Sequence, residues 1–252
     1  MNKSKKIIQL ILGKKLTDYF KYNNLNRYLK SVQKLNDSQF ESFLKKNYPE
    51  VQIIKQKLLT PKVCLDIGAH YGIWSFLLSK IFKKTNIYSF EPTKRSFNIL
   101  QKMKKRFKLN FKPINKGLGN KETVAFIDTI GDSAMNHISC QGEKIFIDTL
   151  DNFSTQNKLN KVDFIKIDVE GYELNVIKGG EIIIKKCMPV IYCEIIDIFS
   201  KRYGKTANST VNLLLKIGYS CFGFNEKIRK FEKVKGANKK YSNYLFIEKH
   251  TN

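Results

Sequence analysis

The chain has 252 residues, with 46 lysines and arginines against 22 aspartates and glutamates, and a formal net charge of +24. This length suits one large domain with a well-buried core, and no apolar run reaches the roughly 18 residues that a membrane-spanning helix needs. The five cysteines show no CxxC spacing, which favours reduced thiols in a cytoplasmic protein over a disulfide-stabilised fold.

The basic charge alone would favour a nucleic-acid or anionic-membrane partner. Only five of the 46 basic residues are arginines, however, and arginine is the residue that grips phosphate with two parallel hydrogen bonds. We therefore interpret most of the lysines as a solvated coat that reflects coding bias, and keep a nucleic-acid partner as the less favoured alternative.

Residues 1–60 are predicted to form an N-terminal helical extension without recognisable chemistry. Ser38, followed three residues later by Glu41, predicts a capping box at the start of the third helix. Pro61 separates this extension from a domain that spans residues 61–252. The helices of the extension are expected near residues 5–12, 17–29, 39–47 and 50–59.

Strand and helix patterns alternate from Pro61 onward, which predicts an α/β fold with a mostly parallel sheet and helices on both faces. The lysine-rich segment 226–240 is expected to be a loop or a hairpin. The predicted strands cover residues 63–67, 86–90, 109–114, 123–128, 145–147, 162–167, 190–195, 219–224 and 243–247.

The stretch VCLDIGAHYGIWS, residues 63–75, joins an apolar strand to an amphipathic helix. Gly68, Ala69 and Gly72 keep side chains out of the intervening turn, which leaves room for a ligand against the backbone. The free amides at the start of the following helix attract a carboxylate or a phosphate.

Four acidic residues stand at or near the ends of apolar strands: Asp66, Glu91, Asp168 and Glu194. Such a position is costly unless the acid meets a ligand, a partner or water. Glu91 follows Asp66 by 25 residues, close to the offset at which an acid ending the second strand binds ribose hydroxyls. The pattern DxGxxxG differs from GxGxxG, so we expect a nucleoside-containing cofactor other than a dinucleotide.

Four stretches of the chain together resemble the FkbM family of S-adenosylmethionine-dependent methyltransferases: DIGAHYGIWS, SFEPTKRSF, TLDNF with FIKIDVEGYELNVIKGG, and VIYCEI. The similarity covers residues 61–248. It implies a Rossmann-like class I methyltransferase fold, with a seven-stranded sheet whose last strand is reversed. It also implies S-adenosylmethionine as co-substrate, and methylation of a hydroxyl on a sugar, glycan or natural product.

The resemblance also implies the site residues. Asp66, Gly68, Ala69 and Gly72 match the motif at the amino-acid end of the cofactor, with His70 where relatives usually have Asn. Glu91, which precedes Pro92, matches the ribose-binding acid. Asp168, Glu170 and Gly171 match the family's DVEG. The expected cofactor-binding residues are Asp66, Gly68, Ala69, His70, Gly72, Glu91, Pro92 and Asp168.

A hydroxyl acceptor must lose its proton during methyl transfer, and the candidate bases are Asp168 first, Glu170 second, then Glu194 and His137. Alternatively, Asp168 bonds the amides of the helix that follows it. The carboxylates of Asp168, Glu170 and Glu194 could also hold a hard cation such as Mg²⁺, but nothing in the sequence requires a metal.

Two other functions remain open at this point: a nucleic-acid methyltransferase, favoured by charge, and a non-catalytic S-adenosylmethionine-binding protein. No NPPY or DPPY motif supports methylation of a base nitrogen. The acceptor site is expected to involve the N-terminal helices, the loop 129–143 and the segment 226–240.

Overall fold

The computed structural model describes residues 22–128 and 137–249. The chain divides into two compact units, one within residues 1–52 and one within residues 53–252, and each is considered by itself. The helix predicted over residues 5–12 lies outside the described residues. Among the described residues, no helix is long and apolar enough to cross a membrane.

The first unit contains α3 (Tyr22–Gln33) and α4 (Asp37–Asn47), and α5 (Pro49–Lys57) begins within it. The capping box predicted at Ser38 and Glu41 is wrong, because Asn36 caps α4: its Oδ1 accepts the Gln39 amide at 2.9 Å, and Gln39 Oε1 accepts the Asn36 amide at 3.1 Å. The sequence NDSQ offers a complete box two residues earlier than Ser38, which brings Asp37 and Ser38 into the first turn of the helix.

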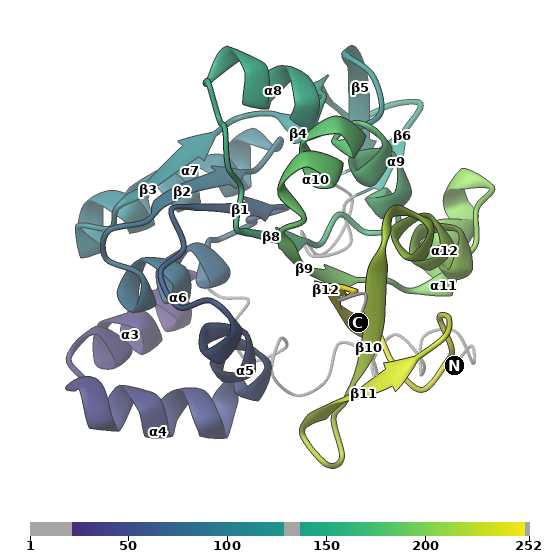
Figure 1. Ribbon diagram of the computed structural model, residues 1–252. Coiled ribbons are helices and arrows are strands. Elements are labelled where there is room, and N and C mark those ends of the chain that lie inside the picture. The colour runs from purple at the N-terminus through teal and green to yellow at the C-terminus, as the bar shows by residue number, and fades with distance from the viewer. Residues whose placement is uncertain (1–21, 129–136, 250–252) are drawn as a thin grey trace, which may run out of the picture. The chain divides into compact units, whose positions relative to one another are not determined.

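The second unit is built on an eight-stranded sheet in the order β11-β10-β12-β9-β8-β1-β2-β3. The five strands from β9 to β3 run parallel, and β12 is antiparallel to both of its neighbours. This arrangement confirms the predicted α/β fold with its reversed last strand (Figure 1). The strands are β1 (Val63–Ile67), β2 (Asn86–Phe90), β3 (Phe111–Ile114), β8 (Phe164–Ile167), β9 (Val190–Glu194), β10 (Tyr219–Asn225), β11 (Lys230–Val234) and β12 (Asn243–Glu248).

The sheet has one strand more than the seven expected. The additional strand is β11, which forms an antiparallel hairpin with β10 inside the segment predicted as a loop or hairpin. Arg229 precedes β11 with a φ of 56°, a left-handed conformation that suits a tight turn. The hairpin therefore extends the sheet beyond the seven strands that the sequence resemblance implies.

A separate four-stranded sheet has the order β4-β7-β5-β6. The predicted strands near 123–128 and 145–147 exist, but they pair with each other here and not in the main sheet. One face carries buried Ile127, Ile145 and Ile147, which pack with Tyr172. The strands are β4 (Gly117–Leu118), β5 (Thr123–Asp128), β6 (His137–Ser139) and β7 (Glu143–Asp148).

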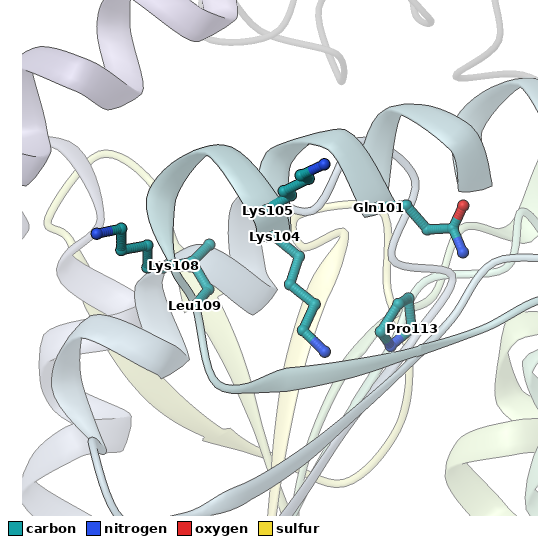
Figure 2. Close-up of a pocket in the computed structure, with 6 residues that line it drawn as sticks. All are labelled: Gln101, Lys104, Lys105, Lys108, Leu109 and Pro113. Carbon is teal, nitrogen blue, oxygen red and sulfur yellow. The ribbon is translucent and has the colours of Figure 1, made fainter.

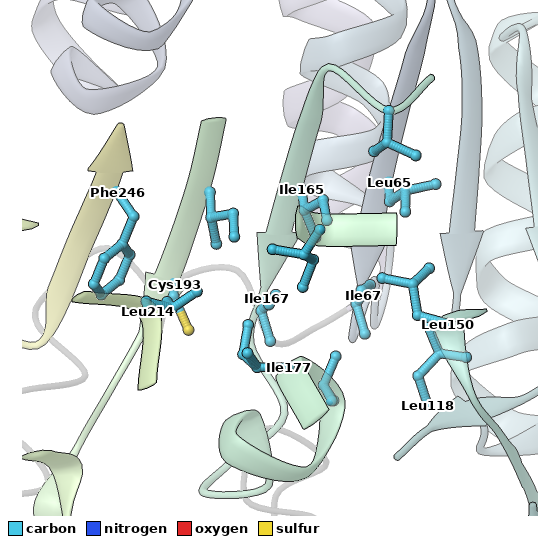
Figure 3. Packing of buried hydrophobic residues seen from close by; sticks show 14 of the residues in the cluster. Leu65, Ile67, Leu118, Leu150, Ile165, Ile167, Ile177, Cys193, Leu214 and Phe246 are labelled. Carbon is cyan, nitrogen blue, oxygen red and sulfur yellow. The ribbon is translucent and has the colours of Figure 1, made fainter. Parts of the chain in front are cut away.

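Helices cover both faces of the main sheet. On one face, apolar side chains of β1, β8 and β9 pack with α8 (Leu150–Gln156), α9 (Glu173–Lys178), α10 (Glu181–Cys187) and α12 (Ala207–Ile217), as Figure 3 shows for Ile165, Leu150, Ile177 and Leu214. On the other face, Trp74 of α6 (Ile73–Ile81) lies 6.2 Å from the Phe164 ring and 4.9 Å from the Tyr192 ring. Phe107 of α7 (Lys94–Phe107) packs edge-on against Phe76 of α6.

All five cysteines are free thiols. Cys64, Cys193 and Cys221 are buried in strands of the main sheet, as their apolar surroundings in the sequence predict. Burial raises the pKa of the Cys221 thiol to about 12, so this sulfur stays protonated and behaves as a small apolar side chain.

Candidate active site

The glycine turn after β1 is held against β2 by its backbone. The amides of Gly68 and Ala69 both donate to the Phe90 carbonyl, at 3.0 and 2.8 Å, and Gly68 and Gly72 have φ values of 77° and 87°. A Cβ at Gly68 would lie 1.8 Å from the Asp168 carbonyl oxygen, and a Cβ at Gly72 would meet Met103. The absence of a side chain at Gly68 thus lets the ends of β1 and β8 approach closely, and its absence at Gly72 lets the turn pack against α7 (Lys94–Phe107).

His70 follows in the same turn, with a φ of 50° and its ring stacked on Tyr71 at 3.8 Å between centroids. Burial lowers the pKa of the imidazole to about 4, so His70 is neutral at physiological pH. Its backbone amide donates to Glu91 Oε2 at 2.9 Å, which joins the turn after β1 to the end of β2.

Glu91 is 5% exposed and is held from two sides. Besides the His70 amide at Oε2, its Oε1 accepts the Thr93 amide at 3.0 Å and the Thr93 hydroxyl at 2.7 Å. Burial raises the pKa of Glu91 in spite of these bonds. The Asn115 side chain donates to the carbonyls of Glu91 and Pro92, which fixes the backbone at this strand end.

Asp66 lies inside the sheet. Its carboxylate is 0% exposed, accepts the Ser75 hydroxyl at 2.6 Å and lies 3.4 Å from Lys166 Nζ. The predicted cofactor residue thus supports the glycine turn from within. Lys166, which the sequence analysis did not single out, also lies 3.3 Å from Asp168.

Three predicted catalytic acids come together beyond the ends of β8 and β9. One carboxylate oxygen of each of Asp168, Glu170 and Glu194 lies within 4.8 Å of the other two. Burial first, and then the negative charge of Asp168, raise the pKa values of Glu170 and Glu194 well above the usual range. Carboxyl groups in this state can accept or hold a proton near neutral pH.

Glu173 adds a fourth carboxyl group. It is 2% exposed, its Oε1 accepts the Gly171 amide at 2.8 Å, and burial raises its pKa to about 7. Glu173 therefore bonds a backbone amide just before α9, and Asp168 pairs with Lys166. In the sequence EGYE, Glu173 follows Glu170 by three residues, and this spacing is the sequence feature that could have placed Glu173 beside the acid cluster.

Aromatic side chains stand beside the acids. The rings of Tyr172 and Tyr203 meet at 5.1 Å and 67°, and the Tyr203 hydroxyl accepts the Ile138 amide of β6 at 3.0 Å. Arg202 lies over the Phe199 ring at 4.5 Å, and its charge opposes the raised pKa of Glu170. The second sheet thus reaches the strand ends through β6. The side chain of His137, the fourth candidate base, lies outside the described residues.

A surface cavity of about 460 Å³ lies elsewhere, between the C-terminal half of α7 and β3. Figure 2 shows its lining of three lysines with Gln101, Leu109 and Pro113. Lys104 and Lys105 belong to the last turn of α7 and Lys108 is its C-cap residue, so none of the three lysines belongs to the acid cluster. The cavity thus contributes no residue to the strand-end site.

Comparison with curated proteins finds one sequence match. The chain is 26% identical over 133 residues to the Hexuronic acid methyltransferase AglP of Haloferax volcanii. The aligned region covers 51% of this chain and 54% of that protein. The chain thus spans about half the length of this curated relative.

A comparison with solved structures gives matches with TM-scores below 0.5. The FkbM methyltransferase of Methylobacillus flagellatus KT has a TM-score of 0.49 at 15% identity, over 93% of this chain and 62% of that one. Precorrin-6y C5,15-methyltransferase of Geobacter metallireducens GS-15 has a TM-score of 0.46 at 13% identity, over 80% of this chain and 87% of that one.

The family model of the FkbM methyltransferase domain matches residues 66–221, more than half of the chain. This span runs from Asp66 through the glycine turn, Glu91 and the acid cluster to β10. The chain belongs to the FkbM methyltransferase family.

Proposed function

We propose that this protein is an S-adenosylmethionine-dependent O-methyltransferase that acts on a hydroxyl of a sugar, glycan or small natural product. The observation that carries the proposal is the convergence of the glycine turn, Glu91 and the acids Asp168, Glu170 and Glu194 on one edge of a parallel sheet. Ligands of open α/β sheets bind at this edge, outside the carboxyl ends of the strands.

The residues at the strand ends fit the cofactor. Glu91 Oε2 accepts the His70 amide, and a carboxylate oxygen can accept two hydrogen bonds, so it can also take a ribose hydroxyl. The turn from Gly68 to Gly72 and Pro92 would lie against the amino-acid end and the adenosine. When bound, S-adenosylmethionine supplies a methyl group on a positively charged sulfur, which leaves as neutral S-adenosylhomocysteine when the acceptor oxygen forms the new bond.

The protein's own contribution is to position the acceptor and to take its proton. Asp168 is the first candidate base, because its side chain is 38% exposed and stands at the open side of the cluster. The proton of the acceptor hydroxyl would pass to Asp168. Glu170 and Glu194, with raised pKa values, would hydrogen-bond the acceptor or relay the proton. We expect this chemistry to need no metal.

A sugar acceptor has two supports. The name of the Haloferax volcanii relative specifies a hexuronic acid as its substrate. In addition, the rings of Tyr172 and Tyr203 could cover the apolar face of a sugar ring, and the carboxyl group of Glu170 could bond its hydroxyls.

The test is incubation of the purified protein with [methyl-³H]-S-adenosylmethionine and fractionated cell extract. We expect label in a carbohydrate-containing fraction, and loss of labelling in the double variant Asp168→Asn/Glu170→Gln with S-adenosylhomocysteine affinity retained in calorimetry. Glu122→Gln, an exposed acid directly before β5, is the matched control.

Persistent labelling by the double variant would remove both acids from the role of base. Cofactor binding without labelling of any fraction would favour the non-catalytic alternative. Label in RNA or DNA, with affinity that falls steeply as salt increases, would instead favour a nucleic-acid acceptor, for which the lysine-rich segment 226–240 is the candidate contact.

A further inference from the structure

Lys166 is a charged residue in the middle of a buried strand. In β8 it lies in register with Asp66 of β1 and Tyr192 of β9, and its side chain is 4% exposed. An ammonium group buried without partners costs several kcal/mol, on the order of the free energy that holds a domain together. A lysine at this position therefore requires partners inside the sheet.

The ammonium has three hydrogens and three oxygen neighbours. Lys166 Nζ donates to the Gly68 carbonyl at 2.9 Å, and it lies 3.4 Å from Asp66 Oδ1 and 3.3 Å from Asp168 Oδ2. Burial lowers the pKa of Lys166, but the carboxylates of Asp168 and Asp66 outweigh that effect and the net shift is upward. Lys166 is thus a permanent cation at neutral pH.

The two carboxylates differ in their surroundings. Asp66 is fully buried, and the Ser75 hydroxyl holds its other oxygen. Asp168 is 38% exposed and belongs to the cluster with Glu170 and Glu194. Lys166 therefore contacts the fully buried Asp66 inside the sheet, and toward solvent it contacts Asp168, the first candidate for the base.

The Gly68 carbonyl adds the second connection. It belongs to the turn that contacts the cofactor in the proposed function, and the close approach of Gly68 to the Asp168 backbone already brings the two strand ends together. One ammonium group thus ties the cofactor turn of β1 to the candidate base of β8.

We infer that Lys166 is a positioning residue for methyl transfer, which fixes the Asp168 carboxylate relative to the cofactor turn. The inference rests on the proposed function. Displacement of a reacting group by about 1 Å can cost roughly 100-fold in rate, so a loose Asp168 should lower the rate of transfer more than the affinity for cofactor.

The test compares Lys166→Met with the double variant Asp66→Asn/Lys166→Met, and uses Lys216→Met of α12, an exposed lysine, as control. The double variant removes the buried anion that Lys166→Met would leave unpaired, so it should fold even where the single variant does not. Each protein is assayed for S-adenosylhomocysteine affinity by calorimetry, and for the initial rate of label transfer to the accepting extract fraction at saturating S-adenosylmethionine.

We expect both Lys166 variants to transfer label roughly 100-fold more slowly than the parent, with affinity for S-adenosylhomocysteine reduced less than about tenfold. A double variant that regains the parent rate would show that Lys166 only neutralises Asp66, and would overturn the inference. An unchanged rate in Lys166→Met would do the same. A parent protein that neither binds S-adenosylhomocysteine nor transfers label would instead refute the proposed function itself.

Discussion

Substitution of Gly68 by alanine tests whether the close approach of β1 and β8 stabilises the catalytic unit. Gly68 has a φ of 77°, and a left-handed conformation costs a residue with a Cβ about 1–2 kcal/mol. The new Cβ would also lie 1.8 Å from the Asp168 carbonyl oxygen, so the two turns must move apart by more than 1 Å to restore an ordinary contact. Overpacking of this kind costs about 1–3 kcal/mol more.

Gly204 provides the matched control, because its φ is 65° and a Cβ there would meet nothing within 4 Å. We expect Gly204→Ala to lower the free energy of unfolding by about 1–2 kcal/mol and Gly68→Ala by about 2–5 kcal/mol. The single tryptophan, Trp74, packs on Phe164 of β8, so its fluorescence during urea unfolding reports on the sheet.

Equal losses for the two variants would refute the reasoning, since the steric conflict distinguishes Gly68 from Gly204. Calorimetry with S-adenosylhomocysteine adds a second measurement. Gly68→Ala is expected to weaken binding because the turn is displaced, whereas Gly204→Ala is expected to leave it unchanged.

Three further predictions concern buried acids. Glu91→Ala leaves the amides of His70 and Thr93 without their acceptor, so it should destabilise the protein by about 1–3 kcal/mol and weaken S-adenosylhomocysteine binding at least tenfold. The control Glu122→Ala, at an exposed position, should change neither quantity, and unaltered affinity in Glu91→Ala would exclude Glu91 from the cofactor site. Burial raises the pKa of Glu173 from 4.5 to about 7, so the folded protein holds this proton more tightly than the unfolded chain, and stability should fall as pH rises from 4.5 through 7. Glu173→Gln should remove this loss of stability, so in denaturant titrations the variant should be more stable than the parent at pH 8 and similar to it near pH 4. A variant that is less stable than the parent at pH 8 would contradict the prediction. For Asp148, burial raises the pKa, but the hydrogen bonds from Lys116 and Asn152 outweigh that effect and the net shift is downward. The contribution of the Asp148 carboxylate to the free energy of unfolding is therefore present above pH 3.8 and is lost as the pH falls through the lowered pKa. Asp148→Asn should lower the free energy of unfolding at pH 7, and an equal loss at pH 2 would argue against this account.

The strand ends could be predicted from the sequence because each acid interrupts an apolar run. Glu91, Asp168 and Glu194 lie at the carboxyl edge of the parallel sheet, as their positions after apolar segments indicate, whereas Asp66 lies one residue before the end of β1 and is buried inside the sheet. Their roles toward cofactor and acceptor stay predictions. Periodicity and spacing locate a strand end well, since both are local properties of the chain.

Lys166 was missed because a lysine in a chain of net charge +24 is easily interpreted as part of a solvated surface. The available signal was its position between Ile165 and Ile167, in a strand apolar on both sides. A central parallel strand is buried on both faces, so a lysine inside it must pair with an acid of a neighbouring strand.

Pairing partners far apart in the sequence were the least predictable feature. Strands 123–128 and 145–147 were identified, but their separation into a second sheet depends on contacts across the whole chain. The Asn36 cap illustrates a local ambiguity, because Asn36 and Ser38 both begin plausible capping boxes.

The position of β12 has a consequence for how the sheet is assembled during synthesis. Residues Asn243–Glu248 pair with β9 on one side and β10 on the other, although both of these strands precede them in the chain. The β10–β11 hairpin is made earlier but has no neighbour in the sheet until β12 arrives. The sheet therefore cannot be completed before β12 has been synthesised, and until then the edge of β9 is exposed and can pair with another strand.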